Sequence, residues 1–241
     1  MLRESYQRLR ELNPSWVVEL GTPAGAGWIE GGAFAEPERG PFAELLTQIG
    51  ERLQTRDRKV IAASFALRFG WSSAAALGPH LLAGLVPDLA LANTWLRFSA
   101  NGALFERVCL IEPRLSTLSA HATLVAQSLP VVDALSRWSR FPRKALWGQV
   151  ESSWAAQFEP VLTALGRAGE VLQTIQAFFA DDANAPHAYE VTHCDVTRVY
   201  HRRASCCLYY KVPSGHYCVS CPLITDDERI ERNKAWTERT L

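Results

Sequence analysis

The stretch CCLYYKVPSGHYCVSC (206–221) holds four of the six cysteines of this 241-residue chain, in the spacing CC-x10-C-x2-C. Two cysteines separated by two residues can direct both sulfurs at one metal centre across a tight turn. The Pro-Ser-Gly turn signal at 213–215 can fold the second pair back onto the first. The adjacent pair requires a local bend, because neighbouring side chains of a strand point to opposite faces. This spacing alone leaves three readings open: an iron-sulfur cluster, a structural zinc site, and redox-active or plain buried thiols.

The composition fits a folded protein without an electrostatic bias. Apolar side chains make up 48% of the chain, and 25 basic residues balance 25 acidic ones, so no net field favours a nucleic acid or an anionic membrane. The N-terminus lacks the apolar run of a secretory signal, and prolines and charges interrupt the apolar stretch 60–92. We expect a cytoplasmic protein with no transmembrane segment and no nucleic-acid partner. In a reducing cytosol, clustered cysteines more often bind metal or do redox chemistry than form structural disulfides.

Apolar periodicity predicts an α+β fold that is predominantly helical, with short β-hairpins and a C-terminal cysteine-rich segment. Helical spacing covers the ranges 5–12, 41–54, 115–129, 143–158 and 161–179, with a further helix from about 58. Hairpins are expected for 16–20 with 27–34, for 94–113 around Asn-Gly, and for 189–203.

Prolines are expected to divide the helices, because proline lacks an amide donor and clashes with the preceding turn. Pro79 and Pro87 should break the apolar stretch into short helices, and Pro130 should open a new one. A closing helix should begin at Thr225, which forms a capping box with Glu228. We predict a single domain over 1–241.

The cysteine spacing and the residues around it resemble the signature of a known family. RASCCLYYKVPSGHYCVSCPL (203–223) resembles the C-terminal signature of the FhuF-type ferric-siderophore reductases: a basic residue, a small residue, Ser or Thr, and then CC-x10-C-x2-C. Arg203 and Ser205 occupy the basic and hydroxylated positions. Weaker similarity covers 129–138 and 145–154, where Gln149 replaces the Asn of a Leu-Trp-x-Asn element.

The resemblance implies a site, a cofactor and an activity. Its ligands for a 2Fe-2S cluster would be Cys206, Cys207, Cys218 and Cys221. The protein would then be an oxidoreductase that reduces Fe(III)-siderophore by one electron and releases Fe(II) for iron assimilation. Two lobes are the alternative to one unit: an N-terminal lobe with hairpins (1–115), and a helical lobe (116–241) that ends in the iron-sulfur segment (about 188–223) and a terminal helix.

Two partners follow from this activity, a ferric siderophore and a separate electron donor such as a ferredoxin or reductase, because no NADPH or flavin motif appears. We also allow for peripheral contact with the inner membrane. Two other functions stay open. One is a non-enzymatic binding module held together by a four-cysteine zinc site, and the other is an iron-sulfur protein for electron transfer or redox sensing.

The segment 196–217 is basic and contains no acidic residue. We expect Arg202, Arg203 and Lys211 to raise the potential of a reduced cluster and to attract an anionic chelate. Four cysteines suffice as ligands, so His201 and His216 are not expected to bind the cluster.

The remaining cysteines and the tryptophans are expected to be structural. For Cys109 and Cys194 we expect small buried side chains. Trp71, Trp147 and Trp154 are expected to pack in the core rather than to line a siderophore groove.

Overall fold

The structure is a computed structural model that describes residues 1–13, 18–182 and 184–240. It is mostly helical, with one four-stranded sheet and one two-stranded hairpin, which confirms the expected α+β class. The helices are α1 (Leu2–Leu12), α2 (Gly40–Arg52), α3 (Arg58–Gly70), α4 (Ala74–Ala83), α5 (Ala120–Ser139), α6 (Arg143–Ala164), α7 (Val171–Phe178) and α8 (Asp226–Arg239). The strands are β1 (Val18–Leu20), β2 (Trp28–Glu30), β3 (Thr94–Phe98), β4 (Phe105–Leu110), β5 (His187–His193) and β6 (Val196–Arg202).

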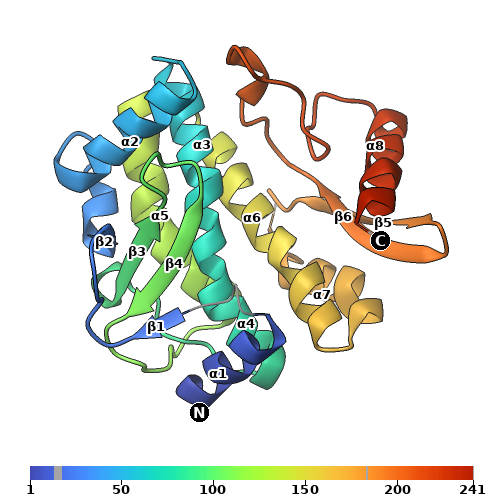
Figure 1. The fold of residues 1–241 in the computed structure, drawn as a ribbon, viewed down its shortest axis with the longest axis horizontal. Helices are drawn as coiled ribbons and strands as arrows, with labels where there is room; N and C mark the ends of the chain where they lie inside the picture. Colours follow the sequence, from blue (N-terminus) through green and yellow to red (C-terminus); the bar gives the residue numbers. More distant parts are fainter. Residues whose placement is uncertain (14–17, 183, 241) are drawn as a thin grey trace.

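Helix α6 connects the two sides of the molecule. It packs against α3, α4 and α5 on one side and against α7 and β6 on the other, as Figure 1 shows. Side chains along almost its whole length are therefore buried, including Trp147, Trp154 and Phe158. The helix has no free polar face, and its polar side chains must find partners inside the protein.

The stretch Arg58–Ala83, which covers α3 and α4, is long and apolar enough by length and composition to cross a membrane. However, 78% of its most apolar window is buried inside the structure. Phe65 and Phe69 on α3 pack with Phe34, Phe42 and Phe98 in an aromatic core beside the sheet. The stretch thus has the surroundings of a core helix and is weak evidence for a membrane span.

The N-terminal hairpin prediction is wrong. The sheet has the order β1-β4-β3-β2, so β1 and β2 lie at opposite edges. β1 pairs in parallel with β4, and β2 pairs antiparallel with β3. The predicted β3–β4 hairpin forms and inserts between them, because its two longer strands offer partners on both sides. Residues 16 and 17 of the predicted first strand lie outside the described residues.

Two of the three proline predictions are also wrong. Pro79 lies inside α4 and Pro130 inside α5, while the break after α3 is a short 3₁₀ turn at Trp71–Ser73. A proline leaves the carbonyl four residues earlier without its helical donor. For Pro79 that carbonyl belongs to Ala75, and it accepts a hydrogen bond of 2.6 Å from the Tyr6 hydroxyl. Tertiary contacts therefore compensate for the lost bond and keep the helix intact.

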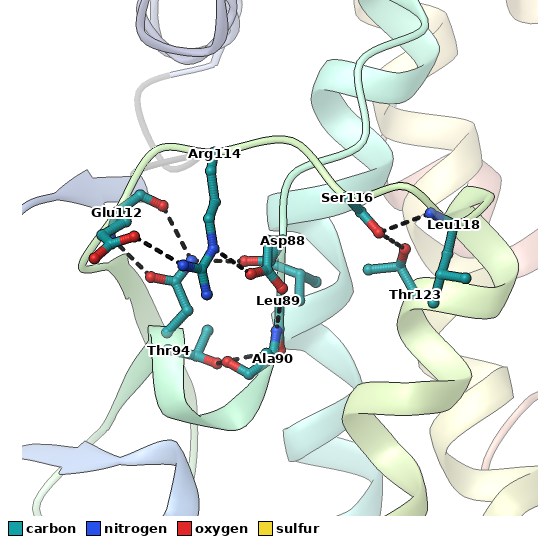
Figure 2. A network of polar contacts seen from close by, with 10 residues as sticks. Asp88, Leu89, Ala90, Thr94, Glu112, Arg114, Ser116, Leu118 and Thr123 are labelled. Carbon is teal, nitrogen blue, oxygen red and sulfur yellow. Dashed lines mark hydrogen bonds and ion pairs between the residues drawn. The ribbon is translucent and has the colours of Figure 1, made fainter.

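Pro87 lies outside the helices, but it does not end α4: the helix stops at Ala83, where Gly84 adopts a left-handed φ of +68°. Pro87 forms an isolated antiparallel bridge with Leu115, and Arg114 Nε donates to Asp88 Oδ2 at 2.5 Å. Arg114 also donates to Glu112, as Figure 2 shows. These contacts join the segment that follows α4 to the segment that follows β4.

The helical pattern predicted over 161–179 divides into two helices. α6 ends at Ala164, Gly166 takes a left-handed φ of +72°, and α7 starts at Val171. The apolar residues still face the core, so the periodicity identified the buried face and missed the turn between the helices.

The C-terminal part follows the predicted order of elements. β5 and β6 form an antiparallel hairpin whose two turn residues, Cys194 and Asp195, both have positive φ, as a type I′ turn requires. α8 begins after Thr225, whose hydroxyl accepts from the Glu228 N–H as predicted. α8 packs on both strands, and the cysteine segment lies between β6 and α8 in the chain (Figure 1).

Candidate metal centre

The cysteine segment leaves the end of β6 that lies away from the hairpin turn (Figure 1). The bend required after the adjacent cysteines is present, because Leu208 adopts a left-handed φ of +59°. A short 3₁₀ helix, Tyr209–Lys211, follows it. Gly215 then turns the chain so tightly against the Tyr209 carbonyl that a Cβ would overlap the oxygen. The Arg203 N–H donates to the Ser220 carbonyl at 3.0 Å, which joins the two ends of the segment.

These turns bring the four thiols together in two pairs. The side chains of Cys207 and Cys218 are close enough to shift each other's pKa, as are those of Cys206 and Cys221, and Cys221 also lies within electrostatic reach of Cys218. Each pair thus takes one cysteine from the first half of the motif and one from the second. The bend at Leu208 allows this, because it points the two adjacent side chains toward different partners.

Backbone amides point at the sulfurs. The Leu208 N–H donates to Cys206 Sγ at 3.3 Å, and the Leu223 N–H donates to Cys221 Sγ at 3.5 Å. The backbone of Tyr209 bonds to Cys207 in the same way, and the backbone of Ser220 bonds to Cys218. Hydrogen bonds of this kind stabilise negative charge on sulfur and tune the potential of an iron-sulfur centre.

The electrostatics of the segment favour the thiolate form of one cysteine, Cys218. The hydrogen bond from Cys207 and the charge of Arg203 lower the pKa of the Cys218 thiol to about 5. The same hydrogen bond, together with burial, raises the pKa of Cys207, which keeps the donated proton. Burial raises the pKa of Cys221. A metal binds thiolates, so this preformed thiolate lowers the cost of metal binding.

The donor set fits a centre with two metal ions better than one with a single ion. A zinc ion binds sulfur at about 2.3 Å, which places every pair of its four sulfurs about 3.8 Å apart. Within the described parts of the chain, the four cysteines do not form a group of ligand atoms that all lie within 4.8 Å of one another. Two close pairs match an arrangement in which each of two irons is held by two cysteines.

A polar contact docks the segment on α6. Gln149 is fully buried, and its Nε2 donates to the Ser205 carbonyl at 3.0 Å and to Ser205 Oγ at 2.7 Å. Its Oε1 accepts from Arg203 Nη1 at 3.3 Å, and Ser205 Oγ donates to the Ala145 carbonyl at 2.6 Å. The amide at this position therefore orients both the basic and the hydroxylated residue of the motif.

The three predicted tuning residues are placed differently. Arg203 is close enough to Cys207 and Cys218 to lower the pKa of both thiols. Arg202 instead extends toward Asp226 of α8, with 3.8 Å between Nη1 and Oδ1. Lys211 is exposed on the 3₁₀ helix, and no contact between its side chain and a cysteine occurs among the described residues. Of the three, Arg203 alone lies against the thiols.

Neither histidine of the segment bonds to a cysteine within the described structure. His201 Nε2 lies 2.8 Å from Ser152 Oγ on α6, and burial lowers its pKa to about 3, so the ring is neutral. His216 packs edge-on against Tyr209. Both serve the packing of the segment.

A second cation near the site, Arg68, was not among the predicted site residues. Arg68 on α3 is largely buried, donates to the Ala103 and Ser64 carbonyls, and lies within electrostatic reach of Cys207 and Tyr209. Burial and the neighbouring charge of Arg52 lower its pKa to about 10. Arg68 interrupts an apolar helix, and a charge in an otherwise buried stretch is the signal that could have indicated a role.

The structure confirms some of the expectations for the remaining cysteines and the tryptophans and corrects others. Cys109 is buried as expected, and its thiol donates to the Gly21 carbonyl at 3.1 Å. Cys194 is exposed, which corrects the buried expectation, because the hairpin turn lifts it off the sheet. Trp147 and Trp154 are core residues, whereas Trp71 is 41% exposed where the 3₁₀ turn between α3 and α4 reaches the surface.

One family model matches the chain. Residues 203–223 match the FhuF 2Fe-2S C-terminal domain, which confirms the resemblance of the cysteine segment. Because the matched domain is a 2Fe-2S domain, the expected 2Fe-2S cofactor is confirmed as well. No curated protein and no solved structure matches the chain.

Proposed function

We propose that this protein is a cytoplasmic ferric-siderophore reductase in which Cys206, Cys207, Cys218 and Cys221 hold the 2Fe-2S cluster. The observation that carries the proposal is the pairing of the four thiols within the segment that matches the FhuF domain. In the loaded protein these four cysteines would supply the sulfur ligands of the cluster, two from each half of the motif.

The cluster supplies one electron at a time, and one electron suffices for this substrate. Ferric iron is a hard cation that the anionic oxygens of a siderophore hold strongly, whereas ferrous iron is held far more weakly. The protein needs no general acid, base or nucleophile. Its own residues must keep the cluster near the surface and provide a docking face for a bulky chelate.

Cationic groups around the thiols support this role. Nε and Nη2 of Arg52 and Nε of Arg203 are buried without a hydrogen-bond partner among the described residues. Arg68 interacts electrostatically with both Arg52 and Cys207. The charges of Arg203 and Arg68 interact with the thiols and make the surroundings of the cluster positive, which favours the approach of an anionic chelate.

Exposed side chains of the cysteine segment form the surface from which an electron donor would reach the cluster. Lys211, Tyr217 and Val219 are exposed on the cysteine segment itself. The segment therefore offers a route by which a separate donor, such as a ferredoxin or reductase, reaches the cluster. The same surface would carry any peripheral contact with the inner membrane.

A single-turnover experiment tests the function. The anaerobic protein is reduced, freed of reductant, and mixed with a ferric hydroxamate in the presence of a ferrous chelator. We expect one Fe(II) trapped per cluster oxidised, with the cluster absorbance returning to its oxidised form. A cluster that stays reduced with every ferric chelate, but passes its electron to a redox protein, would instead identify an electron-transfer or sensing protein.

A further inference from the structure

A second group of metal-binding side chains lies at the opposite end of β6 from the cysteine segment. His193, Cys194 and Glu238 each offer one ligand atom, and the three atoms lie within 4.8 Å of one another. His193 Nε2 is 2.6 Å from Glu238 Oε1. β6 spans seven residues, about 20 Å at the usual rise per residue, so this group is separate from the cluster.

The scaffold holds the three side chains in place. Cys194 is the first residue of the two-residue turn, and its positive φ of +50° fixes the direction of the thiol. Glu238 lies in the last turn of α8, which is joined to the hairpin by hydrogen bonds of the Tyr200 hydroxyl to Thr237 Oγ1 at 2.8 Å and to the Asn233 carbonyl. The ligands therefore come from a rigid turn and a docked helix.

The solvent exposure of the three side chains and the charges around them suit the binding of a cation. His193 is 27% exposed and Glu238 57% exposed in their side chains, and Cys194 is exposed, so an ion can enter from solvent. Glu231 lies seven residues before Glu238, on the same face of α8, and close enough to interact electrostatically with His193. Two cations near the three side chains are engaged elsewhere: Lys234 Nζ donates to Glu231 Oε1 at 2.8 Å, and Arg198 donates to the Thr240 carbonyl.

We propose that His193, Cys194 and Glu238 form a second metal site for a divalent ion of the zinc class, with a water molecule as the fourth ligand. One nitrogen, one sulfur and one carboxylate oxygen are the ligand types that zinc accepts in tetrahedral sites with an open position. Nitrogen and oxygen ligands on one zinc ion lie about 3.3 Å apart, so the pair at 2.6 Å needs only a small outward shift.

Metal binding would add a link between α8 and the β5–β6 hairpin. The ion takes the place of the hydrogen between His193 Nε2 and Glu238 Oε1, and it displaces the proton of the Cys194 thiol, which is released to solvent. A simple His-Glu ion pair explains two of the three side chains but gives no role to the thiol beside them. The site is independent of the proposed reductase activity.

Zinc titration of the full-length, cluster-loaded protein tests the site. Calorimetry is run anaerobically with Zn²⁺, and the cluster absorbance is followed in the same samples. The variants are C194S and E238Q, and the matched control is E190Q, which changes an exposed carboxylate on β5 of the same hairpin. We expect one Zn²⁺ per chain in wild type and E190Q, at least about tenfold weaker binding in C194S and E238Q, and an unchanged cluster spectrum.

Hydrogen exchange gives a second measurement. Zn²⁺ should slow exchange of the α8 amides in wild type and leave them unchanged in C194S. The proposal is overturned if no zinc binds, if the variants bind as wild type does, or if binding bleaches the cluster equally in wild type and C194S, because the zinc would then occupy the cysteine quartet. None of these results depends on reductase turnover.

Discussion

Replacing Gln149 with Ala should release the cluster without unfolding the protein. The substitution removes the two bonds from Nε2 to Ser205 and the bond from Arg203 to Oε1. Each net hydrogen bond contributes about 1 kcal/mol, and the bond from Arg203 is long at 3.3 Å and contributes less, so the docked segment should lose on the order of 2 kcal/mol. That loss corresponds to about a 30-fold larger population of the undocked segment.

The assay is the rate at which an iron chelator removes the cluster from the anaerobic protein. If release requires local opening of the segment, Q149A should lose its cluster about 30-fold faster than wild type. The matched control is Q157A, because Gln157 is also buried on α6, but its side chain donates, among the described residues, only to the Ser153 carbonyl of its own helix. Q157A should lower the melting temperature and leave the release rate close to that of wild type.

Equal release rates in Q149A and wild type would refute the docking role of the amide. Equal acceleration in Q149A and Q157A would also refute it, because release would then follow global stability.

Three further substitutions probe the segment and the core. Gly215→Ala places a methyl group on the Tyr209 carbonyl, so we expect loss of cluster at purification; full iron content in this variant would contradict the tight turn. Arg203→Gln should lower the reduction potential by tens of millivolts, roughly, and by more than Lys211→Gln does, because Arg203 alone lies against the thiols; redox titration showing equal shifts would contradict this placement. Burial raises the pKa of Glu151 from 4.5 to about 8, so its contribution to stability is complete below about pH 4.5 and is lost progressively as the pH rises from there to 8. Glu151→Gln should therefore gain stability over wild type, on the order of a few kcal/mol at pH 9 and little at pH 4, in urea unfolding; a constant difference across this range would refute the assignment.

Local signals in the sequence predicted the local structure correctly. Thr225 caps its helix, and Asn101-Gly102 closes its hairpin, because the residues that determine each feature lie within a few positions of one another. In the cysteine motif, the turn signal at 213–215 predicted the tight turn at Gly215, whereas no local signal located the bend at Leu208.

Features that depend on distant contacts could not be predicted in this way. β1 pairs with β4, which lies far along the chain, and no local pattern specifies that partner. Pro130 stays inside α5 because burial of the helix outweighs one lost hydrogen bond. Arg68 and Gln149 reach the cysteine segment only after α3 and α6 pack beside it, so their part in the site follows from the fold.

The claim that the four cysteines hold the 2Fe-2S cluster is tested most directly by metal and acid-labile sulfide analysis of the anaerobically purified protein. The account predicts two irons and two sulfides per chain in wild type, and loss of both when Ser replaces Cys206, Cys207, Cys218 or Cys221. A protein with one zinc and no sulfide, or a serine variant that keeps its full sulfide content and spectrum, would contradict it.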